Sequence, residues 1–168
     1  VIGSGALVSG VLLARHRSAV GARGPCATAV DAATSAVDVA AWANVLNLLD
    51  LRPGRALKAA AALSAPLLVD RRPSAEAARI LAAGVLGTAV AALPEDLMED
   101  TMLGDTGSNA LGALVGAALA AHPGRAVRTA AALAGTALIL TSERVSFTRV
   151  IARTPALALL DSLGRRPS

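Results

Sequence analysis

The chain of 168 residues is long enough for one domain. With 54% hydrophobic and 17% charged residues, it is more apolar than an average globular protein, which favours a membrane protein. Its net charge of +4 comes from basic residues grouped between apolar runs, and with only 1% aromatic residues it lacks a stacking platform for nucleic acid. These features exclude nucleic acid as a partner, and the single cysteine, Cys26, excludes an internal disulfide. A soluble, alanine-rich helical bundle is the alternative to a membrane protein.

The apolar segments predict an all-α fold, a polytopic transmembrane helical bundle of about five spans plus a partial one at the N-terminus. The run 1–14 is shorter than the roughly 20 residues that a span requires. Because it opens without methionine, we expect it to be the end of a truncated span. The full helices are expected over residues 27–49, 56–69, 75–93, 109–122 and 126–141. Pro94 is expected to end the third of them.

Polar and small residues inside these segments predict how the helices face one another. Asp31 and Asp38 interrupt the segment 27–49, and such acids must face the interior of a bundle or lie near the lipid headgroups. Gly112 and Gly116 form a pair of small residues one turn apart, which is typical of closely packed helices.

Two other groups of polar residues are expected to be solvated. His16 and His122 have no partner at metal-ligand spacing, so we place both in connecting loops in contact with water. The acidic stretch 95–100 is expected to be an exposed helical turn. The alternative for this stretch is that it holds Mg²⁺ close to a diphosphate.

The sharpest motif is the stretch 102–112, which reads Met-Leu-Gly-Asp-Thr-Gly-Ser-Asn-Ala-Leu-Gly. Gly104 and Gly107 let the backbone turn around Asp105, and Ser108 stands where an uncharged helix begins and could cap it. A carboxylate beside a helix N-terminus can bind Mg²⁺, while the N-terminus itself attracts a phosphate. The alternative is a plain turn that caps a helix and binds nothing.

A second polar stretch closes the apolar segment 27–49. Asn44, Asn47 and Asp50 are spaced three apart, so they lie along one face of a helix. Amides and a carboxylate at the end of an apolar helix are costly unless they bind something. We therefore regard these three residues as candidates for ligand binding.

Together the two stretches resemble the polyprenyl-phosphate N-acetylhexosamine-1-phosphate transferases, a family that includes phospho-N-acetylmuramoyl-pentapeptide transferase. The family carries a Gly-Asp-x-Gly-Ser motif followed by a helix, which is matched by Gly104, Asp105, Gly107 and Ser108. Its earlier motif, Asn-x-x-Asn-Leu-x-Asp-Gly-x-Asp-Gly, is matched in part by Asn44, Asn47, Leu48, Asp50 and Gly54.

The resemblance implies a function and a site. The reaction would be the Mg²⁺-dependent transfer of a sugar 1-phosphate from a UDP-sugar to polyprenyl phosphate, with release of UMP, in cell-envelope glycan synthesis. Asp105 would be the metal ligand and the catalytic residue, and the substrate would be held by Asn44, Asn47, Asp50 and Ser108. The chain would be a multi-pass protein of the cell membrane, with both motifs on the cytoplasmic face and a homodimer as one possible assembly.

Two domains of unequal size are expected on this basis. Residues 1–142 would be a membrane-embedded helical domain, the C-terminal part of a larger family domain, and residues 143–168 a basic amphipathic cytoplasmic tail. The tail could lie on the membrane surface with its basic face toward anionic headgroups. Alternatively, Arg144 or Arg149 would bind a substrate phosphate. The basic residues divide equally between the two faces, so charge does not select the orientation.

A catalytically silent membrane scaffold or binding protein is the rival hypothesis. Pro53 stands where the family has its second motif aspartate, and the family's paired aspartates and C-terminal histidine cluster have no counterpart in this sequence. Changes around a metal site often cost about 10–100-fold in activity. We therefore expect these 168 residues to show no turnover on their own.

Overall fold

The computed structural model describes residues 2–20 and 24–164, and within them the fold is entirely helical. This confirms the prediction of an all-α chain. The elements follow one another as α1 (Ile2–Val20), α2 (Pro25–Leu49), α3 (Arg55–Ser64), η1 (Ala65–Val69), η2 (Pro73–Ala75), α4 (Glu76–Leu97), α5 (Gly104–Ala121), α6 (Arg125–Ser142), α7 (Phe147–Arg153) and α8 (Pro155–Ser162), where η marks a 3₁₀ helix.

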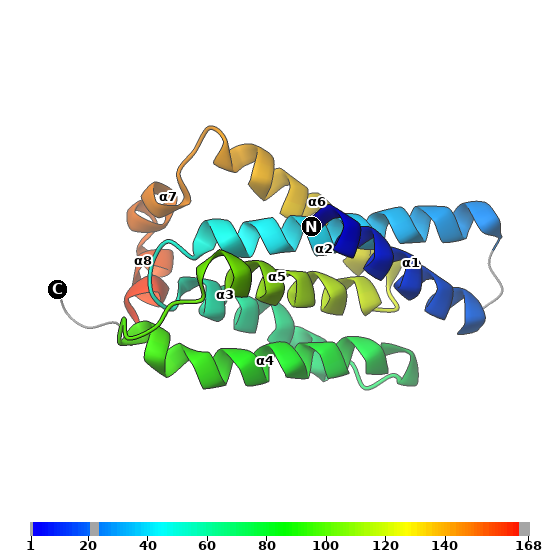
Figure 1. Cartoon of the computed structure of the whole chain (residues 1–168), viewed down its shortest axis with the longest axis horizontal. Helices are drawn as coiled ribbons and strands as arrows, with labels where there is room; N and C mark the ends of the chain where they lie inside the picture. The colour runs from blue at the N-terminus through cyan, green and yellow to red at the C-terminus, as the bar shows by residue number, and fades with distance from the viewer. Residues whose placement is uncertain (1, 21–23, 165–168) are drawn as a thin grey trace.

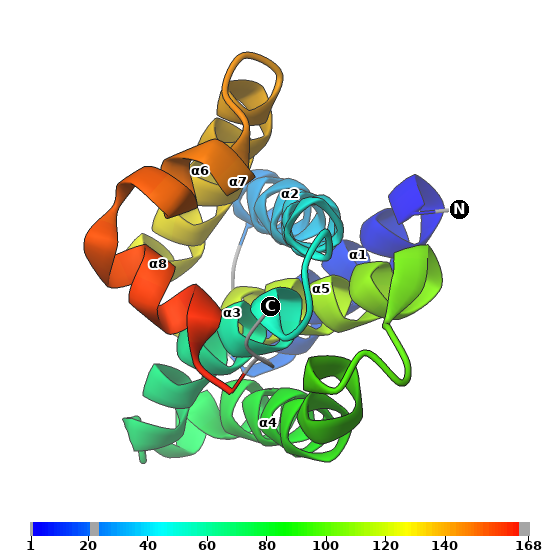
Figure 2. The ribbon, with the colours of Figure 1, turned by 90° about the vertical axis from the view of Figure 1, so that its left-hand side faces the viewer.

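The helices form a bundle around a central pair, α2 and α5. The two lie side by side along the long axis of the molecule, with α4 parallel to them on the outside (Figure 1). Viewed end-on, α1, α3, α4 and α6 surround the pair (Figure 2). α7 and α8 fold back across the end of the bundle where α2 finishes and α5 begins (Figure 1). Both ends of the central pair therefore bring together residues that are far apart in the sequence.

Close contact between α2 and α5 depends on the two glycines that the sequence singled out. A β carbon at Gly112 would lie 2.3 Å from the Trp42 carbonyl oxygen, and one at Gly116 would lie 2.4 Å from the Asp38 carbonyl oxygen. No side chain fits at either position, so the backbones of the two helices touch directly. The prediction of a small-residue packing pair is confirmed.

The core beneath this contact is built mostly from alanine and a few larger side chains. Alanine suits it because it favours the helix and lets neighbouring helices approach closely. The larger buried side chains cluster between α2, α3, α4 and α5; they include Trp42, Val45, Leu46, Leu57, Val85, Leu111 and Val115.

Two helical stretches in the described part of the chain are long and apolar enough to cross a membrane, Pro25–Leu49 and Pro73–Leu97. The first lies half buried at the centre of the bundle. The second lies on the outside of the bundle, where Ile80 and Val90 face outward, 64% and 73% exposed, while Val85 on its inner face is fully buried in the core. That the chain crosses the membrane about five times stays a prediction.

Several predicted boundaries are wrong. Pro94 lies inside α4, which continues to Leu97, because a proline near the end of a helix removes only one late hydrogen bond. α5 begins at Gly104, four residues before Ser108, so Ser108 does not cap it. α1 extends to Val20, beyond the expected run 1–14, and therefore includes His16.

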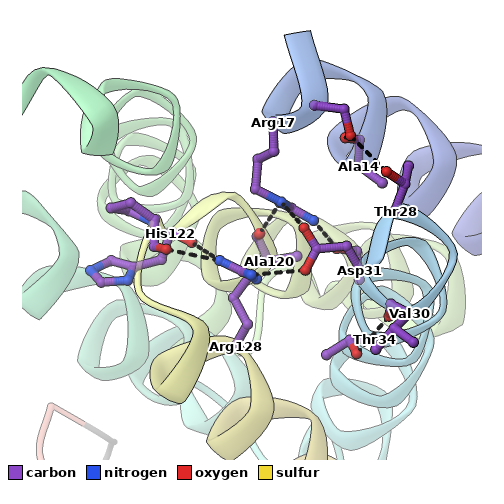
Figure 3. A network of polar contacts seen from close by, with 12 residues as sticks. Ala14, Arg17, Thr28, Val30, Asp31, Thr34, Ala120, His122 and Arg128 are labelled. Atoms are coloured by element: carbon purple, nitrogen blue, oxygen red, sulfur yellow. Dashed lines mark hydrogen bonds and ion pairs between the residues drawn. The ribbon is translucent and has the colours of Figure 1, made fainter. Parts of the chain in front are cut away.

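A buried polar cluster connects α1, α2, α5 and α6 at the end of the bundle where α5 finishes (Figure 3). The Asp31 carboxylate accepts hydrogen bonds from Arg17 Nε at 2.9 Å and from Arg128 Nη2 at 2.8 Å. The same two guanidinium groups donate to carbonyl oxygens at the C-terminal end of α5, those of Ala120, His122 and Pro123. Of the two locations that the sequence left open for Asp31 and Asp38, the bundle interior is the one observed, since both are buried.

The prediction that His122 lies in contact with water is wrong. It is buried beside this cluster, and its Nε2 lies 3.2 Å from the Asp70 carboxylate. Arg72 also binds Asp70, and its guanidinium holds the pKa of that carboxyl well below its usual range. His122 is buried because the short connection between α5 and α6 turns inward to meet Arg128.

Candidate functional site

The two motifs meet where α2 ends and α5 begins. The Ser108 hydroxyl lies 2.8 Å from Asn47 Oδ1 and 2.7 Å from the Gly104 carbonyl oxygen, and it donates to one of them at a time. Ser108 is fully buried and Asn47 is half-buried, so this contact is partly shielded from water. The structure thus brings together two polar stretches that are 61 residues apart in the sequence.

Gly104 supplies the turn that places Asp105 at this junction. Its φ of 62° lies in the left-handed region, which glycine adopts without steric cost. Asp105 follows in the first turn of α5, where the free N–H groups of a helix favour a negative charge. Its side chain is exposed and makes no hydrogen bond with the described residues, so both carboxylate oxygens face solvent.

Asp50 ends α2 beside Asp105 and is half-buried. Burial, together with the negative charges of Asp96 and Asp105, raises the pKa of Asp50 to about 6, although a hydrogen bond from the Gly104 backbone opposes the shift. Three carboxylates thus lie close enough for their charges to interact. Such an arrangement is unfavourable at neutral pH unless a cation or a proton balances it.

Asp96 belongs to the acidic stretch 95–100, for which the sequence left Mg²⁺ binding open as the alternative to an exposed turn. Its stretch was expected to be an exposed turn, but its carboxylate is buried and accepts a hydrogen bond from the Gly54 backbone N–H at 2.5 Å. Asp96 therefore fixes the loop that follows Asp50. Its neighbours Glu95, Glu99 and Asp100 are exposed, as expected.

A cavity of about 450 Å³ lies between this loop and the end of α4. Its lining includes Asp50, Arg52, Asp96 and Glu99. Glu99 has a φ of 62°, a conformation that costs a residue with a β carbon about 1 kcal/mol or more. The cavity combines several carboxylates with one arginine, a composition that suits a ligand with both a cation and phosphates.

Whether the residues of this site can hold Mg²⁺ depends on how many carboxylate ligands the ion requires from the protein. Within residues 2–20 and 24–164, no group of three or more His, Cys, Asp or Glu side chains is placed to hold a metal ion. Mg²⁺ usually takes one or two carboxylates from the protein and completes its shell with water and substrate phosphates. Asp50 and Asp105 fit that smaller requirement, and the assignment of Asp105 as the metal ligand stays a prediction.

The remaining predicted site residues are present at the surface without partners. Asn44 is exposed on α2, about one turn before Asn47, and its side chain makes no hydrogen bond with the described residues. Arg144 is exposed just after α6, and its guanidinium is likewise unpaired within the described part of the chain. Neither is connected to the Ser108 contact, so their roles in substrate binding stay predictions.

The C-terminal tail docks on the same end of the bundle through α8. Arg55 forms a two-pronged ion pair with Asp161, with distances of 2.7 and 3.0 Å, and also donates to the Thr148 hydroxyl at 3.1 Å. The Lys58 ammonium group binds the carbonyl oxygens of Leu160, Asp161 and Leu163. The tail is therefore attached to α3, and its amphipathic character stays a prediction. Residues 165–168 of the predicted tail lie outside the described residues.

Comparisons with protein-family models, curated proteins and solved structures returned no match for this chain. The likeness to the transferase family accordingly depends on the two sequence motifs alone. The sequence offered Asp96 only as one of several acids in the stretch 95–100, and Asp161 only as an acid among apolar residues, because their partners lie 42 and 106 residues away.

Proposed function

We propose that the end of the bundle around Ser108 and Asp105 is a divergent phosphoglycosyl transferase site. It would transfer a sugar 1-phosphate from a UDP-sugar to polyprenyl phosphate. The observation that carries this proposal is the partly buried hydrogen bond between Ser108 and Asn47, which joins the two stretches that resemble the family's motifs. A plain helix cap would not need a polar partner from another helix.

Some side chains at this junction would position the loop, and others would contact the substrate or Mg²⁺. Ser108 and Asn47 hold the N-terminus of α5 against the C-terminus of α2, so they position the loop instead of meeting the substrate. The free N–H groups in the first turn of α5 would bind a phosphate oxygen. Asp50 and Asp105 would hold Mg²⁺, which supplies neutralisation of the diphosphate and of the leaving UMP. Arg52, on the rim of the cavity, would bind a second phosphate.

We also propose that the chain spans a membrane several times, with this end on the cytoplasmic face. The support comes from α4, an apolar helix on the outside of the bundle whose outward face exposes Ile80 and Val90. Exposed apolar side chains also cover the outward faces of α1 and α6, among them Leu7, Val8, Leu12, Leu133 and Leu140. Lipid would cover these faces without cost, whereas water would not.

A silent scaffold is the second candidate, and one feature of the cavity favours it. Pro53 lines the cavity at the position where the family has its second motif aspartate, so one carboxylate is missing from the site. A binding protein of this kind would keep the Ser108 contact for stability and would still bind a nucleotide or a lipid phosphate.

The deciding experiment is an assay with membranes that contain the protein at its natural length. Labelled UDP-sugars and undecaprenyl phosphate are supplied, and label in the lipid fraction and release of UMP are measured. Asp105→Asn should lower transfer by about 10–100-fold, as expected for the loss of a metal ligand or its support. Glu143→Gln, which removes another exposed acid, should leave transfer unchanged.

Three outcomes separate the candidates. Transfer that depends on Asp105 supports the transferase. Equal transfer by the wild type and Asp105→Asn removes Asp105 from the mechanism. Absence of transfer with every UDP-sugar, together with retained binding of UDP in the same membranes, favours the silent scaffold.

A further inference from the structure

Asp38 is the most deeply buried acid of the chain and has no role in the site described above. It lies in the middle of α2 with 0% of its surface exposed, and neither carboxylate oxygen has a hydrogen-bond partner among the described residues. An ionised carboxylate in such a place is costly, by several kcal/mol or more, unless a cation pairs with it. A neutral carboxylic acid is far less costly.

The cations nearest in the fold are already engaged elsewhere. Asp31 and Ser35 precede Asp38 on the same face of α2, and Arg17 binds both of them, with Nη2 at 2.7 Å from the Ser35 hydroxyl. Arg128 binds Asp31 as well, and both guanidinium groups also hold carbonyl oxygens at the end of α5. The two arginines thus satisfy Asp31 and leave Asp38 unpaired.

The other elements packed against α2 provide no alternative partner. On α1, Arg15 and His16 are exposed, and on α6 Arg125 is exposed. α5 contains no charged residue after Asp105. On α3, the cations are Arg55 and Lys58, and both bind the C-terminal tail.

We propose that Asp38 is a proton-binding site in the interior of the bundle, and that it carries its proton in the arrangement seen here. When the carboxylic acid releases that proton to solvent, the buried carboxylate attracts Arg17 or Arg128. Arg17 can reach a new partner only by releasing part of its present set, because all three of its guanidinium nitrogens already donate hydrogen bonds. Arg128 has one donor, Nε, without a hydrogen-bond partner among the described residues, and turning it toward Asp38 would disturb the bonds that the same guanidinium makes to carbonyl oxygens at the end of α5. Protonation of Asp38 would therefore control how firmly α1 and α6 are attached to the central pair. This inference depends on neither the metal nor the transfer reaction.

The chain contains its own reporter for the test. Trp42 is the only tryptophan of the 168 residues, is buried, and follows Asp38 by one turn on the same face of α2. Its emission, measured for the chain in lipid nanodiscs across the pH range, should change in a single step in the wild type. Asp38→Asn, which mimics the neutral acid, should remove that step. Asp100→Asn, an exposed control, should leave it in place.

A second measurement compares two buried acids on the same helix. Asp38→Asn and Asp38→Leu should retain at least the melting temperature of the wild type at neutral pH, because no pairing is lost. Asp31→Asn removes the partner of two arginines and should lower the melting temperature clearly. The proposal is overturned if the emission of Trp42 does not depend on pH, or if the step persists in Asp38→Asn. It is equally overturned if both Asp38 variants lose as much stability as Asp31→Asn.

Discussion

Replacing Gly112 by alanine is the most direct test of the packing that positions the site. The added β carbon would lie 2.3 Å from the Trp42 carbonyl oxygen and 2.7 Å from the Ala43 α carbon, whereas ordinary contacts begin at 3.4 Å. Both obstacles are backbone atoms, so they cannot rotate away. The shortfall of 3.4 − 2.3 = 1.1 Å must be met by moving α5 away from α2.

The cost of that movement can be judged from two opposing effects. Inserting a methyl group into a closely packed core typically costs about 1–3 kcal/mol, while replacing glycine by alanine within a helix gains about 0.5–1 kcal/mol. The overlap with backbone places Gly112→Ala near the upper end of the first range, so we expect a net loss of about 2 kcal/mol. The displacement would also stretch the hydrogen bond between Ser108 and Asn47, which lies about one turn from Gly112.

The assay is thermal unfolding in detergent or nanodiscs, followed by circular dichroism, with Gly87→Ala as the control. Gly87 lies inside α4 with nothing within 4 Å of its would-be β carbon, so alanine there should stabilise the chain slightly. We expect the melting temperature to fall by about 4–8 °C for Gly112→Ala and to stay level or rise for Gly87→Ala. Equal behaviour of the two variants would refute the direct backbone contact between α2 and α5.

Three further predictions concern the end of the bundle that carries the motifs. Ser108→Ala should lower the free energy of unfolding by about 1–2 kcal/mol, since it leaves the Asn47 amide oxygen without its donor, and an unchanged denaturation midpoint would contradict this. Asp50 has a folded-state pKa of about 6 against an ordinary 3.8, so the folded chain binds this proton more tightly and stability should fall as the pH rises between these values. Asp50→Asn should flatten that dependence, and Mg²⁺ should raise the melting temperature more above pH 6 than below pH 4 if Asp50 holds it. Asp161→Asn should release α8 from Arg55, which limited proteolysis of the tail would detect as faster cleavage at an unchanged melting temperature of the bundle.

Local features of the sequence were sufficient to predict the helices and the polar stretches within them. The segments 27–49, 75–93 and 126–141 correspond to α2, α4 and α6, because apolar runs bounded by proline, glycine and charge specify a helix without reference to the rest of the chain. Gly112 and Gly116 were likewise recognisable, since their spacing alone places them on one face of a helix.

The errors occurred where a neighbouring element changes the local preference. Ser108 has the chemistry of a helix cap, yet α5 begins four residues earlier because Gly104 adopts a left-handed conformation and Asn47 offers Ser108 a buried partner. His122 has the surroundings of a loop residue, yet the turn between α5 and α6 folds inward toward Arg128. Spacing along one segment contains no information about these partners.

The site itself was decided by the tertiary structure. The sequence identified Asp50, Asp105 and Ser108 as candidates, but only the packing of α2 against α5 shows that they lie at one end of the bundle. Asp96 joins them from a segment that was expected to face water. Helix formation depends on neighbours within a few residues, whereas the position of a charged group depends on which helix faces pack together, and those contacts span from 42 to 106 residues of chain.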